Sequence, residues 1–209
     1  MPPDVPPRAP ATRATSRRRR SDAARNVDLL VAAARQLFDE RGVDVPLDEI
    51  ARRAGVGNAT LYRNFPSRGD LLVAVYSEEV DALCEQGARL LDTPSSTPAE
   101  ALFRWLDLFA AHVAARRPLA MAAISHEPAD RRGELAEGWH AAMGATTAAL
   151  LAPAQQAGVI RRDLTTADLL ALTNATALAS ANPQDARRLI GVLRTGVEVP
   201  PRPGQSPLE

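Results

Sequence analysis

Apolar residues recur along most of this chain at the spacing of an amphipathic helix. Between residues 21 and 41 they fall three or four positions apart, at Leu30, Ala33, Ala34, Leu37 and Phe38. This spacing gathers the apolar side chains on one face of a helix. Gly42 follows, and glycine is common just past the end of a helix. The pattern predicts a first helix over residues 21–41.

Turn-forming residues divide the next stretch into short segments. Pro46 suits the first turn of a helix, Gly55 suits its end, and Pro66 breaks the chain again. The segments between these breaks predict helices over residues 47–54, 58–64 and 68–91. Similar breaks further along predict helices over residues 98–115, 117–126, 132–157, 166–181 and 184–197.

No stretch alternates apolar and polar residues for long enough to indicate a β-strand. We therefore expect an all-α fold of about nine helices, with an N-terminal three-helix domain over residues 21–67 and a C-terminal helical bundle over residues 68–198. Residues 1–20 are rich in Pro and Arg, and residues 199–209 are rich in Pro. These compositions predict a disordered N-terminal tail and a flexible C-terminal tail.

The formal net charge of zero hides a segregation of charge along the chain. Residues 1–68 hold 13 Arg against 8 Asp or Glu, a net charge of +5, and the rest holds 12 against 17, a net charge of −5. The sequence contains no lysine, so every basic side chain is a planar guanidinium that can pair with phosphate at two points. A basic N-terminal third indicates that this part of the chain meets a polyanion.

Composition also limits the kind of protein. No apolar run approaches the roughly 20 residues that cross a bilayer, and the N-terminus lacks the apolar segment of a secretory signal. We therefore expect a cytoplasmic protein with no membrane partner. The single Cys84 and three scattered His residues predict no disulfide and no metal site.

Motifs of common catalytic sites are missing. The sequence has no Gly-x-Ser-x-Gly, no phosphate-binding loop and no His-Glu-x-x-His, because His126-Glu127 is followed by Pro128 and lacks the second histidine. A helical hydrolase or transferase therefore has little support. We predict that the chain is not an enzyme and has neither catalytic residues nor a cofactor.

Residues 47–65, LDEIARRAGVGNATLYRNF, have the features of a helix-turn-helix. Small Ala51 and Ala54 stand where two helices would cross closely, Gly55 allows the chain to reverse, and Val56 can fill the angle between the helices. The second helix is short and mostly polar, which suits insertion into the major groove of DNA. In this motif the sequence resembles the TetR family of bacterial repressors.

The resemblance extends over about residues 25–75. AAARQLFDERG is similar to the family's first helix, IARRAGVGNATLYRNF to its helix-turn-helix, and PSRGDLL to the start of its fourth helix. It implies that a double-stranded DNA operator is bound through Asn58, Thr60, Tyr62, Arg63, Asn64 and Arg68. Tyr62 and Arg68 stand at positions that usually hold phosphate, while Arg63 and Asn58 suit base recognition, since Arg pairs with guanine and Asn with adenine.

Three positions depart from the family's usual pattern. Gly57 replaces a frequent Ser at the start of the recognition helix, so that capping would pass to Asn58. Asn64 replaces a frequent His, which changes a phosphate contact. Pro46-Leu47 stands where a Thr commonly caps the preceding helix, so one phosphate contact is expected to be missing there.

Several of these contacts have an alternative interpretation. Tyr62 could instead pack against the first helix, and Arg63 could simply face solvent. The run that ends in Arg19 and Arg20 could be an arm that enters the minor groove or a solvated charge cluster.

The resemblance further implies a ligand pocket in the C-terminal bundle and a dimer formed by the last two helices. The pocket candidates are aromatic, Met and polar residues at helical spacing: Trp105, Phe109, His112, Met121, Ser125, Trp139 and Met143. His112 and His140 are the polar residues best suited to point inward. The same stripes also suit an ordinary core.

The dimer candidates are small or aliphatic residues on the last two helices: Leu169, Leu172, Thr176, Leu189 and Leu193. Such stripes suit four-helix packing across a two-fold axis, although packing within one chain could use them too. We expect a homodimer, because one short recognition helix contacts too few bases for specificity and two copies on a palindrome supply the rest.

These features predict a ligand-responsive regulator, most simply a repressor that an unidentified small molecule releases from its operator. In this hypothesis the ligand shifts the long helix over residues 68–91, so that the two recognition helices no longer match successive major grooves. The alternatives are an activator, a DNA-binding protein without a ligand, or a ligand-binding dimer whose helix-turn-helix no longer binds DNA. A core without a cavity would favour the ligand-free protein.

Overall fold

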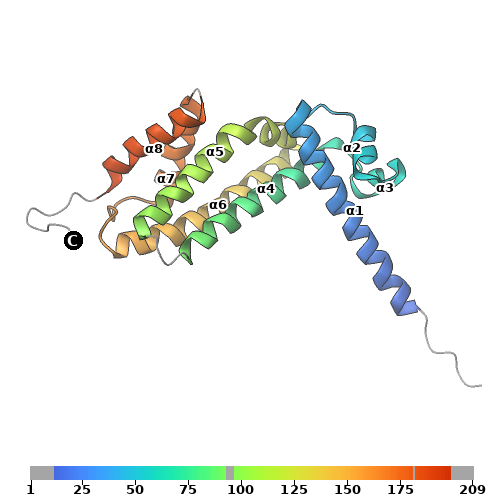
Figure 1. Ribbon diagram of the computed structural model, residues 1–209, viewed down its shortest axis with the longest axis horizontal. Coiled ribbons are helices and arrows are strands. Elements are labelled where there is room, and N and C mark those ends of the chain that lie inside the picture. Colours follow the sequence, from blue (N-terminus) through green and yellow to red (C-terminus); the bar gives the residue numbers. More distant parts are fainter. Residues whose placement is uncertain (1–11, 93–96, 181, 199–209) are drawn as a thin grey trace, which may run out of the picture. The chain divides into compact units, whose positions relative to one another are not determined.

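Helices make up nearly all of the computed structural model, which describes residues 12–92, 97–180 and 182–198, with side chains for all of these except residues 12–21, 129, 130 and 183. Eight α-helices occur in these residues (Figure 1): α1 (Thr12–Arg41), α2 (Leu47–Ala54), α3 (Asn58–Asn64), α4 (Arg68–Leu91), α5 (Pro98–Ser125), α6 (Ala129–Gln156), α7 (Thr166–Ala179) and α8 (Pro183–Val197). Within the same residues, the one extended pairing is an isolated antiparallel bridge between Ile160 and Glu198. The all-α prediction is confirmed.

Helix α5 replaces two predicted helices and accounts for the difference from the predicted nine. The prediction ended a helix before Pro118, because proline lacks the backbone N–H and its ring crowds the preceding turn. Instead, Pro118 lies inside α5. Pro118 and Ala114, whose carbonyl loses its helical partner, are both exposed, so water can satisfy that carbonyl. Buried Leu119 and Ala123 continue the packed face beyond the proline.

Helix α1 is longer than predicted at its N-terminal end. The prediction began this helix at Ser21, whereas the structure begins it at Thr12. Residues 12–20 contain neither Gly nor Pro and are mostly Arg, Ala, Ser and Thr, so nothing in them interrupts a helix that continues from residue 21. Residues 1–11 and 199–209, which complete the two predicted tails, lie outside the described residues.

The helices form two compact units, Met1–Leu71 and Leu72–Glu209, and α4 begins in the first and continues into the second. In the first unit, α1, α2 and α3 enclose a core of fully buried aliphatic residues: Leu30, Leu37, Ile50 and Leu61. On the exposed side of the α1–α2 contact, Arg53 donates two hydrogen bonds to Glu40, at 3.1 and 3.2 Å. The helical periodicity of the sequence therefore determines which faces meet.

The second unit is built around α5, which contacts α6, α7 and α8. Figure 1 shows α4, α5 and α6 side by side in this unit. The three helices approach closely at Gly87 of α4. A Cβ atom at this position would lie 2.7 Å from the Trp105 ring of α5 and still closer to the Thr146 methyl group of α6. Trp105 is fully buried, and its indole N–H donates to the Thr147 hydroxyl at 2.8 Å.

Polar side chains cap the N-terminal ends of α5, α7 and α8. The Thr97 and Thr165 hydroxyls each accept a backbone N–H and form capping boxes with Glu100 and Asp168, and Asn182 accepts two backbone N–H groups at the start of α8. These caps satisfy helix-end donors that would otherwise need water. Throughout the described residues, every helix is too short or too polar to cross a bilayer.

Candidate functional site

The turn between α2 and α3 has the geometry that the sequence predicted. Gly55 ends α2 in the left-handed conformation, with φ at 68°, which an L side chain rarely adopts. The next N–H, of Val56, donates to the Ala51 carbonyl at 3.0 Å. Gly57 then acts as the N-cap of α3 without any side-chain bond. The expectation that capping passes to Asn58 is therefore wrong, since Asn58 is the first helical residue and its side chain is exposed.

Helix α3 has one anchored face and one open face. Leu61 is fully buried, and Phe65, just after the helix, is also buried. On the other face Asn58 and Arg63 are exposed, and Tyr62 leaves 49% of its surface exposed. Tyr62 is therefore not a core residue.

Two predicted contact residues bond to their own helix in the free protein. The Arg63 guanidinium donates to the Ala59 carbonyl at 3.1 Å and to the Thr60 hydroxyl at 2.8 Å. The Asn64 amide donates to the Thr60 carbonyl at 2.8 Å. Thr60, Arg63 and Asn64 also line an open hollow together with Asp22, Ala23 and Asn26 of α1. Arg63 thus has a defined resting position beside α1.

Arg68, at the start of α4, holds the loop between α1 and α2. Its guanidinium donates to the Val43 and Val45 carbonyls, each at 2.8 Å. The sequence indicated only a phosphate contact for Arg68, because loop carbonyls leave no trace in a residue pattern. Arg19 and Arg20 belong to α1, and the structure describes their backbone but not their side chains.

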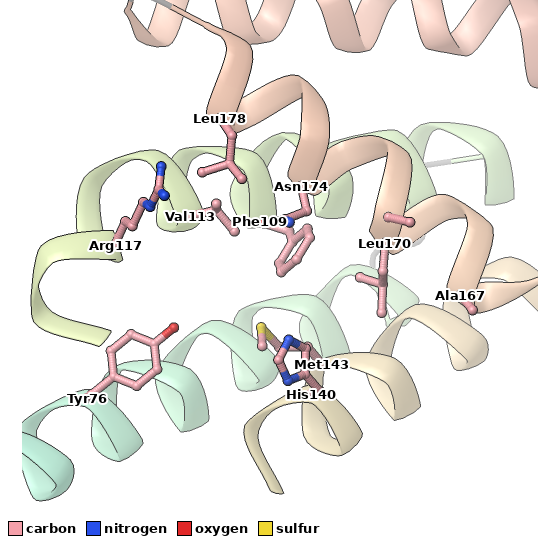
Figure 2. A pocket seen from close by; sticks show the side chains of 11 residues that line it. Tyr76, Phe109, Val113, Arg117, His140, Met143, Ala167, Leu170, Asn174 and Leu178 are labelled. Carbon is pink, nitrogen blue, oxygen red and sulfur yellow. The ribbon is translucent and has the colours of Figure 1, made fainter. Parts of the chain in front are cut away.

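A cavity of about 470 Å³ lies between α4, α5, α6 and α7 in the second unit. Figure 2 shows the side chains that line it, and several of them are exposed, so the cavity is open to solvent: Tyr76, Phe109, Val113, Arg117, His140, Met143, Ala167, Leu170, Ala171, Asn174 and Leu178. This volume falls in the range of roughly 300–1,000 Å³ that small-molecule sites occupy. Most of the lining is apolar, and no acidic side chain belongs to it.

A group of buried aromatic and polar side chains supports the cavity wall at Tyr76. The Tyr76 hydroxyl lies 3.4 Å from His112 Nε2, and the Trp139 ring meets the Tyr76 ring edge-on at 4.5 Å. Burial, with a smaller contribution from the charge of Glu79, raises the pKa of Tyr76 to about 12. Burial, with a smaller contribution from Arg116, lowers the pKa of His112 to about 4. Both groups are therefore neutral at physiological pH.

Known proteins match both units of the chain. The family described as bacterial regulatory proteins, tetR family, matches residues 30–75, and the family described as the C-terminal domain of SbtR-like transcriptional regulators matches residues 97–199. A TetR transcriptional regulator of known structure from Streptomyces coelicolor is 34% identical, with a TM-score of 0.66, over 84% of this chain and 99% of that one. The chain belongs to the TetR family.

Other relatives agree with this assignment. A TetR regulatory protein of known structure from Mycobacterium vanbaalenii is 36% identical, with a TM-score of 0.66, over 86% of this chain and 99% of that one. An HTH-type transcriptional regulator from Staphylococcus aureus is 34% identical over 74 residues, which are 35% of this chain and 40% of that relative. Membership in the TetR family makes the chain a transcriptional regulator with a DNA-binding helix-turn-helix.

In this TetR-family protein the cavity includes only part of the predicted pocket. Phe109 and Met143 line it, as does His140. Trp105 instead fills the core beside Gly87, and Trp139 donates to the Ser77 hydroxyl at 3.0 Å behind the cavity wall. His112 lies behind Tyr76 and does not belong to the lining.

The remaining two pocket candidates lie at the surface. Met121 leaves 54% of its surface exposed, and Ser125 is exposed and donates to the Met121 carbonyl at 2.6 Å. Both were placed on a separate helix in the prediction. Because α5 continues through Pro118 instead, its helical phase carries Met121 and Ser125 to the outside.

The predicted dimer residues differ in how far they are buried. Leu169 is fully buried within the protein, so it is not available to a second copy in this structure. Leu172 leaves 45% of its surface exposed, whereas Thr176, Leu189 and Leu193 are half-buried. Helix α7 thus has two faces, one packed in the core and the other open.

Sequence reasoning missed the contribution of α7 to the cavity. Leu170, Asn174 and Leu178 are four residues apart and share one face of that helix, which lines the cavity. The sequence analysis considered this helix only for the dimer, through Leu169, Leu172 and Thr176, and did not consider the face that lines the cavity. Arg117 carried no signal, because it belongs to no apolar or aromatic stripe. Tyr76 shares the four-residue spacing of Leu72 and Val80, which suits an ordinary core as well as a cavity wall.

Proposed function

We propose that this TetR-family regulator binds a palindromic operator as a homodimer in the cytoplasm and acts as a repressor that a small molecule releases. The observation that carries the proposal is the open face of α3, where Asn58, Tyr62 and Arg63 are exposed while Leu61 fixes the helix to the core. A short helix held in this way can present side chains to base edges in the major groove. The net charge of +5 over residues 1–68 supports the same partner.

The proposed contacts on DNA divide into two kinds. Arg63 and Asn58 read bases, and Arg63 gives up its bond to Thr60 when it does so. Tyr62 donates its hydroxyl to a phosphate, and Thr60 and Asn64 lie where the backbone approaches. Arg68 has further N–H groups beyond the two that hold the loop, since a guanidinium carries five, and these can face a phosphate. Arg19 and Arg20 remain proposed contacts of an N-terminal arm.

We place the dimer surface on the open faces of α7 and α8. Leu172 and Val192 leave 45% and 59% of their surfaces exposed, and Leu189 and Leu193 of α8 are only half-buried. Apolar side chains that gather on two adjacent helices favour burial against a second copy. Thr176 belongs to this surface, and Leu169 does not.

The cavity supports the ligand-responsive form of the proposal over a regulator without an effector. Tyr76 lines the cavity and belongs to α4, the helix that begins at Arg68 beside the helix-turn-helix. A ligand that binds one position of α4 more tightly than another shifts the population towards that position. Through α4, such a shift would change the spacing of the two recognition helices and lower the affinity for DNA.

The decisive experiment measures binding of the full-length protein to the DNA that flanks its own gene, at about 150 mM salt, where unspecific phosphate binding is weak. Wild type is compared with the double variant Tyr62→Phe, Arg63→Ala. We expect tight binding to a palindrome and a loss of roughly tenfold or more in the variant, since one good base contact is worth about 1–3 kcal/mol. Arg104→Ala removes the same charge from an exposed position of α5, outside the helix-turn-helix and the proposed dimer surface, and serves as the matched control.

Equal affinity for the palindrome and for a shuffled sequence would contradict operator binding. The repressor role is tested separately with a reporter gene behind the operator. Expression should rise when the regulator is removed, and a fall would indicate an activator. Sedimentation of the free protein tests the dimer, and a Leu172→Glu, Val192→Glu variant should sediment as a monomer.

A further inference from the structure

The cavity contains a positive charge that has no counter-charge in the part of the chain that the structure describes. Two arginines follow each other on α5, and they differ in their surroundings. Arg116 pairs with the buried Glu79 at 3.1 Å. Arg117 is exposed to solvent, lines the cavity and forms no ion pair with a described residue, and the lining includes no carboxylate. A ligand that enters the cavity therefore meets an unpaired guanidinium.

The two ends of the cavity differ in chemistry. Figure 2 shows Arg117 and Tyr76 at one end and Leu170 and Ala167 at the other. Between them Phe109, Val113 and Met143 form apolar parts of the wall, and His140 and Asn174 add two polar side chains. A site with one charged end and an apolar body is complementary to a molecule with the same division.

We propose that the effector of this cavity is an amphipathic carboxylate, whose anionic head accepts hydrogen bonds from Arg117 and whose apolar chain lies against Phe109 and Leu170. This inference rests on the proposed function, in which the cavity holds the effector. A guanidinium and a carboxylate form short, charge-assisted hydrogen bonds, often at two points. The apolar chain is transferred from water to an apolar wall, which is favourable in proportion to the area that is buried.

Tyr76 adds a donor for the same head group. Because burial keeps its hydroxyl protonated up to about pH 12, Tyr76 can donate to an anion and does not repel it as a phenolate would. When His112 carries its proton on Nε2, it donates to the Tyr76 oxygen and leaves the Tyr76 proton for the ligand. A cationic ligand would meet Arg117 without any carboxylate in the lining to offset the repulsion.

The test uses three probes with the same ten-carbon chain and different head groups: decanoate, decan-1-ol and decyltrimethylammonium. Their dissociation constants are measured on the full-length protein without DNA, by titration calorimetry below the micelle concentration. We expect decanoate to bind roughly tenfold more tightly than decan-1-ol, which corresponds to one charge-assisted hydrogen bond. Decyltrimethylammonium should bind more weakly than both.

Two variants locate the binding site. Arg117→Gln should remove the preference for decanoate over decan-1-ol and leave the affinity for decan-1-ol unchanged. Arg104→Gln removes the same charge from an exposed position of α5 that does not line the cavity, and it should keep the preference. Leu170→Trp fills the apolar end and should abolish decanoate binding. Thermal unfolding by circular dichroism checks that each variant is folded.

Several outcomes would overturn the proposal. These are equal or tighter binding of the alcohol or the ammonium by wild type, no binding of any probe, or a preference for decanoate that survives Arg117→Gln. Decanoate binding that persists in folded Leu170→Trp would place it elsewhere. Since no DNA is present, these results are independent of operator binding, so a failure here and a failure of the proposed function are distinguishable.

Discussion

His112 gives the most specific prediction about stability. It is largely buried behind Tyr76, and burial, followed by the charge of Arg116, lowers its pKa from 6.5 to about 4. In the unfolded chain the pKa returns to about 6.5. As the pH falls below 6.5, the unfolded state therefore binds the proton before the folded state does. The contribution of neutral His112 to the free energy of unfolding is therefore fully present above pH 6.5 and is lost as the pH falls towards 4.

The size of the effect follows from the difference between the two pKa values. From 6.5 to about 4 the difference is about 2.5 pH units, and at 1.36 kcal/mol per unit this amounts to roughly 3 kcal/mol once both states are protonated. A measurement at pH 5 covers only the interval from 6.5 to 5. The free energy of unfolding should therefore lose about 2 kcal/mol through His112 between pH 7.5 and pH 5.

The assay compares wild type with His112→Gln, which keeps a polar side chain near Tyr76 and removes the titration. Urea unfolding is followed by circular dichroism at pH 7.5, 6.5, 5.5 and 5.0. The protein concentration is held constant, because association of two copies would change the apparent stability. Other groups contribute to both proteins alike, so the difference between the two free energies isolates His112.

The difference between the free energies of unfolding of wild type and His112→Gln should decrease by about 2 kcal/mol between pH 7.5 and pH 5. His140→Gln removes an exposed histidine and is the matched control. A difference that stays constant across this range would refute the reasoning, since it would mean that folded His112 accepts a proton as readily as the unfolded chain.

Three further predictions concern packing and capping, and each is checked by urea unfolding at pH 7.5. Gly87→Ala should destabilise the protein by about 1–3 kcal/mol, because its Cβ meets the Trp105 ring. Gly138→Ala, in open space on α6, should instead stabilise it by up to about 1 kcal/mol, and equal effects would contradict the close approach. Thr147→Val leaves the Trp105 N–H without its acceptor and should cost about 1–3 kcal/mol, whereas a neutral effect would indicate that water replaces the hydroxyl. Asn182→Ala should cost about 1 kcal/mol through the lost cap of α8, and no loss would show that the cap is dispensable.

The fold of the first unit could be predicted closely from its sequence, because the residues that determine it act within their own turn or helix. Gly55 requires a left-handed backbone within its own turn, and helical spacing alone places Leu30 and Leu61 in one core. The bounds of α2, α3 and α4 agree with the prediction for the same reason. By contrast, the anchoring of the loop by Arg68 joins residues more than twenty positions apart, and no local pattern indicates it.

In the second unit the elements were predictable, but the roles of their faces were not. Trp105 and Phe109 stand four residues apart on α5, yet Trp105 fills the core at Gly87 and Phe109 lines the cavity. Leu169 and Leu170 are neighbours in sequence, and only Leu170 reaches the cavity. One residue turns a helix by about 100°, so these assignments depend on how the helices are rotated against each other. Periodicity predicts which residues share one face of a helix, but it does not predict which neighbouring helix or cavity that face meets.

The hydrogen bonds of Arg63 in the free protein help to explain why a single recognition helix is insufficient for tight binding to DNA. In the free protein Arg63 already donates to Ala59 and Thr60. A contact with guanine then exchanges these bonds for new ones, and an exchange gains less than a bond formed by an unsatisfied group. Each base contact therefore adds specificity at a modest gain in affinity. The remainder must come from phosphate contacts and from a second recognition helix, which is what the charge of +5 over residues 1–68 and the proposed homodimer would supply.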